Sequence, residues 1–150
     1  MRILMVCLGN ICRSPMAEGI LRHKAQENGW NIEIDSAGTG DWHAGESPDA
    51  RAMEFMDEQG ISIRKLRARQ IRQQDFYDFD LILTMDAENY TNVMRIKPTD
   101  ATANVEMVMN LAHAERNIAV PDPYFGGKEG FVKVYDMLDE ALNHIKNHIR

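Results

Sequence analysis

The sequence has few cysteines and no long apolar run. Only Cys7 and Cys12 occur among 150 residues, which excludes a small secreted scaffold held together by disulfides. No stretch approaches the roughly 18 consecutive apolar residues of a membrane span, and the first residues lack the apolar stretch and cleavage site of a signal peptide. We therefore expect a cytoplasmic protein that associates with no membrane and whose thiols stay reduced.

Basic residues are also in deficit. The chain carries 17 Lys and Arg against 23 Asp and Glu, a formal net charge of −6, which argues against a broad nucleic-acid-binding surface. A small anion pocket remains compatible with this balance, because backbone N–H groups and one or two Arg side chains can build it. The composition, 44% hydrophobic and 27% charged, is globular, and the length predicts a single domain over residues 1–150.

Four short apolar runs alternate with segments typical of helices. The runs predict strands over residues 3–8, 32–37, 81–85 and 105–109, the first central and the second nearer an edge. Helices should begin at Ser14-Pro15, at Ser47-Pro48 and after Asp86, and should end at Asn28-Gly29, at Gly60 and before Pro98. A last helix should bury one apolar face, formed by Phe131, Val134, Tyr135, Leu138, Leu142, Ile145 and Ile149.

The regular alternation of strands and helices predicts an α/β fold, in which a parallel sheet carries helices on both faces. Residues 38–45 and 121–127 are expected to form loops, and residues 64–72 show no period and should be irregular. Ligands of such sheets bind beyond the carboxyl ends of the strands. Cys7 stands at the carboxyl end of the first predicted strand, so we expect the chemistry there.

The segment after this strand combines a thiol, a glycine and a guanidinium. Five residues separate Cys7 from Arg13, and Ser14-Pro15 follows. The Cys and Arg spacing alone recurs by chance and is a weak signal. Its position on a strand-to-helix turn, with Gly9 inside the loop and a hydroxyl after the Arg, makes the signal specific.

A loop of this length can curl so that successive N–H groups point inward and form an anion site at the positive end of a helix. The predicted phosphate-binding residues are Leu8, Gly9, Asn10, Ile11, Cys12, Arg13 and Ser14. Arg13 would add two parallel hydrogen bonds to phosphate oxygens, which a Lys could not. The same N–H groups and the Ser14 hydroxyl would stabilise a thiolate on Cys7, making it a nucleophile. The alternative is an inert buried thiol between Val6 and Leu8.

A second loop supplies a candidate acid. Asp122 lies between Pro121 and Pro123, which stiffen the backbone, and Tyr124 and Phe125 follow as possible walls for an aromatic leaving group. Transfer of a phosphoryl group to sulfur expels an alkoxide or phenolate, and a positioned acid accelerates that step by about 10²–10⁴. The alternative is a structural turn, because Asp-Pro is common in turns.

Together these segments resemble the low-molecular-weight protein tyrosine phosphatase family. The resemblance rests on the residues 7–18 and 122–126, and it extends to residues 35–42, 68–70 and 81–86, so it covers essentially the whole chain. It implies a flavodoxin-like three-layer sandwich with a four-stranded parallel sheet in the order 2-1-3-4. It also implies hydrolysis of phosphotyrosine in proteins and of small aryl phosphates, without metal or cofactor, through a phosphocysteine on Cys7. Arg13 would hold the phosphate, and Asp122 would act first as acid and then as base.

Further roles follow from the same resemblance. Asn10, Ser14 and Ser36 would support the loop through hydrogen bonds, and Ile11, Trp42 and Tyr124 would line the substrate pocket. Cys12 could trap Cys7 in a reversible disulfide as a redox switch, if the curled loop brings their α-carbons within about 7 Å. Tyrosine-phosphorylated proteins would be the partners, phosphate-like oxyanions should inhibit, and a monomer is expected.

Three other functions compete with this interpretation. Arsenate reductases share the scaffold but pass a disulfide along further cysteines, and none follows Cys12. Phosphoarginine phosphatases of the family typically have Thr where this chain has Ile11, which instead offers an apolar wall for a phenyl ring. A non-catalytic module binding FMN needs no nucleophilic Cys, and a response regulator needs an acidic cluster that is missing after the first strand.

Overall fold

A four-stranded parallel sheet forms the centre of the fold in the computed structural model, which describes residues 1–149. The strands are β1 (Arg2–Cys7), β2 (Glu33–Gly38), β3 (Leu81–Thr84) and β4 (Asn104–Met107). Their order is β2-β1-β3-β4, and each neighbouring pair is parallel. The predicted α/β class and the 2-1-3-4 order of a flavodoxin-like sandwich are confirmed, with β1 inside the sheet and β2 at an edge.

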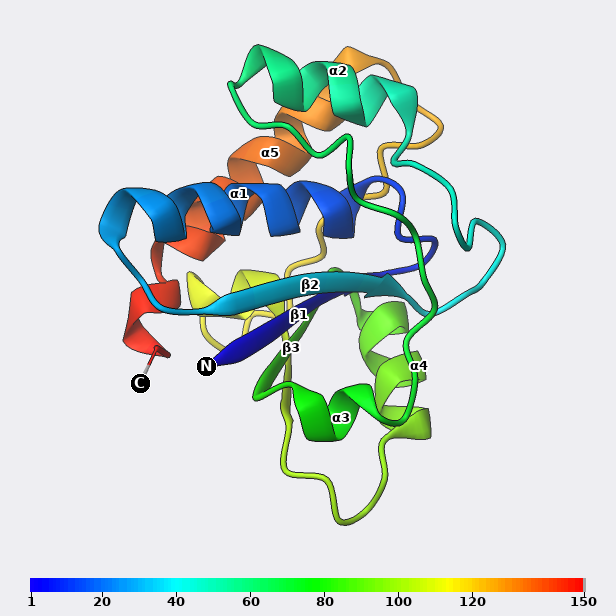
Figure 1. Cartoon of the computed structure of the whole chain (residues 1–150), viewed down its shortest axis with the longest axis vertical. Coiled ribbons are helices and arrows are strands. Elements are labelled where there is room, and N and C mark those ends of the chain that lie inside the picture. Colours follow the sequence, from blue (N-terminus) through cyan, green and yellow to red (C-terminus); the bar gives the residue numbers. More distant parts are fainter. Residues whose placement is uncertain (150) are drawn as a thin grey trace.

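Helices cover both faces of this sheet (Figure 1). On one side lie α1 (Arg13–Asn28), α2 (Ala50–Glu58) and α5 (Lys128–Asn143), and on the other lie α3 (Asp75–Asp78) and α4 (Ala87–Ile96). Two short 3₁₀ helices, η1 (Val108–Leu111) and η2 (Ile145–Asn147), complete the described elements. No helix within residues 1–149 is long and apolar enough to cross a membrane.

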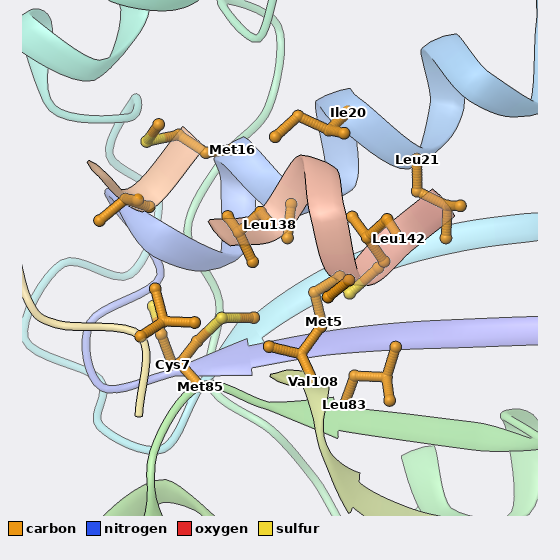
Figure 2. Close-up of a cluster of buried hydrophobic side chains, with 14 of the residues drawn as sticks. Met5, Cys7, Met16, Ile20, Leu21, Leu83, Met85, Val108, Leu138 and Leu142 are labelled. Carbon is orange, nitrogen blue, oxygen red and sulfur yellow. The ribbon is translucent and has the colours of Figure 1, made fainter. Parts of the chain in front are cut away.

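The alternation of side chains along β1 explains the two layers. Ile3, Met5 and Cys7 belong to the larger buried cluster, between the sheet and the α1–α5 pair. Leu4 and Val6 belong to the smaller cluster on the opposite face. Figure 2 shows α1 and α5 side chains meeting those of β1 and β3, with Cys7 at the carboxyl end of the cluster. The thiol therefore stands where the core ends and the loop begins.

Two predicted helix starts are wrong: within residues 1–149 no side chain caps α1, and Asp49 caps α2. α1 begins at Arg13 rather than at Ser14-Pro15, and Ser14 uses its hydroxyl inside the site instead of as a cap. α2 begins at Ala50 rather than at Ser47-Pro48, because the Asp49 carboxylate accepts hydrogen bonds from the first backbone N–H groups of the helix.

Other element boundaries also differ from the predicted ones. The predicted strand over residues 105–109 ends at Met107, and η1 follows it directly. α5 ends at Asn143, so the apolar face predicted to reach Ile149 is completed by the separate turn η2, in which Ile145 is fully buried. α3 was not predicted, since four residues give no readable period. Residues 64–72 contain no helix, as expected, and only an isolated bridge joins Gln70 to Gly38.

Candidate active site

A cavity of about 200 Å³ opens beyond the carboxyl end of β1. Its walls combine the first loop, the loop after β2 and the loop before α5, and they are Cys7, Leu8, Gly9, Ile11, Cys12, Arg13, Trp42, His43, Asp122, Tyr124 and Phe125. The predicted nucleophile, phosphate clamp, acid and pocket walls thus meet at one place. Asn10, Ser14 and Ser36 do not line this cavity and are buried beside the loop.

The loop from Cys7 to Arg13 curls back on the sulfur. Asn10 has a left-handed backbone with φ of 58°, and its backbone N–H donates to Cys7 Sγ at 3.3 Å. β2 approaches this loop so closely that a Cβ on Gly38 would lie 2.8 Å from the carbonyl oxygen of Leu8. Only glycine at position 38 permits that approach, so the edge strand and the curl of the loop depend on each other.

The Asn10 side chain fixes the loop from within. Its Nδ2 donates to Ser14 Oγ at 2.7 Å and to Ser36 Oγ at 3.0 Å, and its Oδ1 accepts from the backbone N–H of Arg69 at 3.0 Å. Ser14 Oγ lies 3.0 Å from Cys7 Sγ. Because Asn10 donates to Ser14 Oγ, the single hydroxyl hydrogen of Ser14 can go to the sulfur or to the carbonyl oxygen of Ala37, which lies 3.4 Å away.

A buried carboxylate extends the network away from the cavity. Ser36 Oγ donates to Glu18 Oε1 at 2.7 Å, while Arg22 donates to Glu18 Oε2 through two nitrogens. Burial raises the pKa of Glu18 above its ordinary value, although the hydrogen bonds from Ser36 and Arg22 oppose that shift. Sequence reasoning assigned no role to Glu18. The i, i+4 spacing of Glu18 and Arg22 on a helix was the available signal.

Arg13 is held by protein groups on one of its nitrogens. Nη1 donates to Asp86 Oδ2 at 2.7 Å and to the carbonyl oxygen of Val120 at 3.0 Å. Nη2 lies 3.8 Å from Asp122 Oδ2, and within residues 1–149 neither Nη2 nor Nε donates a hydrogen bond. These two nitrogens are the pair that can serve a phosphate, because Nη1 is already committed. Asp86, which the sequence indicated only as a helix cap, is therefore a second partner of the clamp.

Asp122 stands across the cavity on an exposed loop. Its Oδ1 accepts from the backbone N–H of Tyr124 at 3.0 Å, and Oδ2 is the oxygen nearest Arg13. The side chain is 41% exposed, compared with 4% for Arg13. The loop is anchored at its start, where the Val120 N–H donates to the carbonyl oxygen of Met85 at 2.8 Å. An acid held in this position faces the same cavity as the sulfur.

Aromatic side chains form the mouth of the cavity. Trp42 is 69% exposed and lies against Gly40, where a Cβ would collide with the indole ring. Tyr124 and Phe125 contact each other edge to face with ring centroids 5.0 Å apart. Phe125, expected from the sequence as a possible wall, lines the cavity and is 92% exposed. The sequence did not indicate His43, which pairs with Glu46 at 3.0 Å. Such a mouth suits a flat aromatic group that carries its charge at the far end.

Cys12 is a second buried thiol in the same loop. Burial and the Asp49 carboxylate raise the pKa of Cys12 above its ordinary value. Both cysteines are free. Within residues 1–149, no group of three or more His, Cys, Asp or Glu side chains is arranged to hold a metal ion.

Comparison with known proteins gives a consistent result. Residues 2–150 match the family described as "Low molecular weight phosphotyrosine protein phosphatase". A protein with that description from Schizosaccharomyces pombe is 41% identical over 150 residues, covering 97% of this chain and 96% of its own. The crystal structure of YfkJ from Bacillus subtilis matches with a TM-score of 0.90 at 36% identity, covering 99% of this chain and 93% of that chain. The crystal structure of DARP, a Drosophila arginine phosphatase, matches with a TM-score of 0.92 at 33% identity, covering 99% and 97%.

Proposed function

This chain belongs to the low molecular weight phosphotyrosine protein phosphatase family, and we propose that it hydrolyses phosphotyrosine in proteins through a phosphocysteine intermediate on Cys7. The observation that carries the proposal is the meeting of three groups at one cavity. Cys7 Sγ accepts hydrogen bonds from the loop, Arg13 presents two uncommitted nitrogens, and Asp122 faces both.

The first step forms the S–P bond and breaks the bond between phosphorus and the tyrosine oxygen. The Cys7 thiolate attacks in line, while the loop N–H groups and Arg13 bind the equatorial oxygens as charge redistributes. Asp122, protonated, donates its proton to the departing phenolate. The products of this step are tyrosine and a cysteinyl phosphate.

The second step reverses the role of the acid. Asp122, now a carboxylate, takes a proton from a water molecule as that water attacks phosphorus. The S–P bond breaks, inorganic phosphate leaves, and the Cys7 thiolate is regenerated with Ser14 Oγ 3.0 Å away to stabilise it. This scheme uses no metal or cofactor.

Phosphotyrosine is favoured over phosphoarginine by the cavity walls. Ile11, Trp42 and Tyr124 line the cavity, and an apolar side chain at position 11 can contact the edge of a phenyl ring. Phosphoarginine is a second candidate substrate, because DARP, named as an arginine phosphatase, has the same fold. Arg13 and the loop would bind the phosphoryl group of either substrate, so the walls must discriminate.

A panel of matched peptides carrying phosphotyrosine, phosphoserine or phosphoarginine tests this proposal in the presence of EDTA. We expect turnover of the phosphotyrosine peptide, and acid quenching during turnover should trap one phosphoryl group on the peptide that contains Cys7. Faster turnover of the phosphoarginine peptide would reverse the assignment of substrate. The absence of any covalent phosphate during turnover would contradict the mechanism.

We also propose that Cys12 protects Cys7 from irreversible oxidation. Peroxide would convert Cys7 to a sulfenic acid, and the Cys12 thiol would displace water from it to form a disulfide. The raised pKa of Cys12 keeps it a neutral thiol, which peroxide oxidises more slowly than a thiolate, so Cys12 stays reduced until Cys7 is oxidised and then loses its proton as the sulfenic hydroxyl leaves as water. Dithiothreitol should restore peroxide-treated enzyme but not peroxide-treated Cys12→Ser. Equal recovery of both proteins would contradict the proposal.

A further inference from the structure

Arg51, on the first turn of α2, joins the two loops that face each other across the cavity. Its Nη2 donates to the carbonyl oxygen of Tyr124 at 2.7 Å, and its Nη1 donates to the carbonyl oxygen of Gly126 at 3.1 Å. The guanidinium carbon also lies 5.6 Å from the centroid of the Tyr124 ring and 5.2 Å from that of Phe131. One side chain therefore holds the backbone on the carboxyl side of Asp122 at two points.

The other end of this connection reaches the phosphate-binding loop. Asp49 binds Arg51 through both carboxylate oxygens, each accepting at 3.2 Å. The backbone N–H of Asp49 donates to the carbonyl oxygen of Ile11 at 2.8 Å. A continuous path of hydrogen bonds thus runs from the loop that holds the nucleophile, through Asp49 and Arg51, to the loop that holds the acid.

Apart from the 3.8 Å ion pair between Arg13 and Asp122, no other polar contact within residues 1–149 joins residues 121–126 to the phosphate-binding loop. Between residues 121 and 126, every hydrogen bond to another element comes from Arg51, whereas the remaining bonds stay within the segment. Most of the segment is exposed, since Tyr124 and Phe125 are 42% and 92% accessible, while Pro123 is buried beside Gly130. The backbone that follows this proline is held by the two hydrogen bonds from Arg51.

We propose that Arg51 is a positioning residue that sets Asp122 at the distance and angle needed to protonate the leaving group. This inference rests on the proposed function, in which Asp122 is the acid. Arg51 itself contacts neither the cavity nor a reacting atom. A planar guanidinium suits this task because its two nitrogens can reach two carbonyl oxygens at once, which a single ammonium cannot reproduce.

The leaving group provides the first test. A phenyl ester needs a proton on its leaving oxygen, whereas a dinitrophenyl ester leaves readily without one. We expect Arg51→Met to lower kcat/KM for phenyl phosphate by about tenfold, part of the 10²–10⁴ that a general acid contributes. The value for dinitrophenyl phosphate and the inhibition by vanadate should change by less than about twofold, because binding and nucleophilic attack do not need the acid.

Two further variants test whether Arg51 acts through its geometry rather than through its charge or through the stability of the fold. Arg51→Lys keeps the positive charge but loses the pair of nitrogens that bind two carbonyl oxygens. Its ratio of phenyl phosphate to dinitrophenyl phosphate turnover should therefore lie nearer to the ratio of Arg51→Met than to that of wild type. Arg64→Met is the matched control, because Arg64 is similarly exposed and pairs with Asp57 but does not contact the acid loop. Equal losses for both esters in Arg51→Met, or a wild-type ratio in Arg51→Lys, would overturn the inference.

Hydrogen exchange supplies a readout that does not depend on catalysis. Amides of residues 124–126 should exchange several-fold faster in Arg51→Met than in Arg64→Met, while amides of residues 8–13 keep their wild-type rates. Unchanged exchange of residues 124–126 would overturn the inference. Failure of the proposed function would appear differently, as wild-type protein that turns over no aryl phosphate although these amides respond to the substitution.

Discussion

The phosphate-binding loop and the acid loop face the same cavity but are held in opposite ways. Residues 7–14 lie at the end of the core, where Asn10 alone makes three side-chain hydrogen bonds and is 3% exposed. Residues 121–126 lie at the surface and are joined to other elements by the two bonds from Arg51. The phosphate-binding loop is thus fixed by the core, whereas the loop that carries Asp122 receives its hydrogen bonds from other elements, within residues 1–149, only from Arg51.

This difference matches the demands of the two tasks. A site for a doubly charged phosphate must have its dipoles fixed before the substrate arrives, because reorganising them during the reaction would add to the barrier. The loop that carries the proposed acid must let a large phosphoprotein bind and its product leave, and an exposed loop can move enough to permit both. Each prediction below tests one side of this comparison.

The largest effect is expected from Cys7→Ser. A serine hydroxyl fits the loop but is a far weaker nucleophile, so turnover of aryl phosphates should fall by roughly 10⁴-fold or more. Calorimetry should still detect binding of inorganic phosphate, because the loop N–H groups and Arg13 remain. Retained turnover would remove Cys7 from its role, and lost phosphate binding would mean that the loop is less firmly built than its hydrogen bonds indicate.

Asp122→Ala should have the next largest effect. We expect kcat/KM for phenyl phosphate to fall by about 10²–10⁴, with a smaller loss for esters of better leaving groups. Asp100→Ala is a suitable control, since Asp100 is exposed and bonds to Tyr77, remote from the cavity. A loss of equal size for all esters would show that Asp122 acts through loop structure rather than as an acid.

Substitutions in the two loops should differ in their effect on the free energy of unfolding. Asn10→Ala should lower the free energy of unfolding by about 2–4 kcal/mol, because it strains a left-handed backbone and leaves buried polar groups without partners. Asn10→Gly should recover about 1 kcal/mol of that loss by relieving the backbone strain. Phe125→Ala in the acid loop should change stability by less than about 0.5 kcal/mol in the same urea titrations. Comparable losses at positions 10 and 125 would contradict the comparison.

The smallest effect is a pH dependence that arises behind the phosphate-binding loop. The raised pKa of Glu18 means that its carboxylate costs stability once it ionises in the folded protein. The stability of wild type relative to Glu18→Gln should therefore be greatest below the ordinary Glu pKa of about 4.3 and should fall as the pH rises through the folded value. Urea titrations near pH 4 and pH 7 measure this difference. A difference that grows in the opposite direction would show that the Ser36 and Arg22 bonds outweigh burial.

The same contrast explains what could be predicted from the sequence. The phosphate-binding loop is local: Cys7 and Arg13 are close in sequence, and the flanking strand and helix place both. The prolines around Asp122 made it a candidate acid, but only the resemblance favoured that role over a structural turn, because Asp-Pro is common in turns. The strand order also came from the resemblance, since alternation alone predicts a parallel sheet but not its order.

Asp86, Arg51 and Glu18 could not be predicted as supporting residues, because their roles depend on contacts that only the fold creates. Asp86 binds Arg13 across 73 positions, and Arg51 binds Tyr124 across the same number. Glu18 lies in the buried first half of α1, and only the fold places it beside Ser36. The misplaced start of α2 has a similar cause, because several residues near it can cap a helix and tertiary contacts choose among them.

The two hydrogen bonds of Val120 have a consequence for redesign. Its N–H is bound to Met85 and its carbonyl oxygen to Arg13, so the buried chain is pinned immediately before residue 121. The segment from residue 121 to the start of α5 can therefore be replaced as a unit. A replacement that keeps Asp122 and two carbonyl acceptors for Arg51 should change the residues at the mouth of the cavity, and with them the preference among phosphoproteins, without altering Cys7 or Arg13.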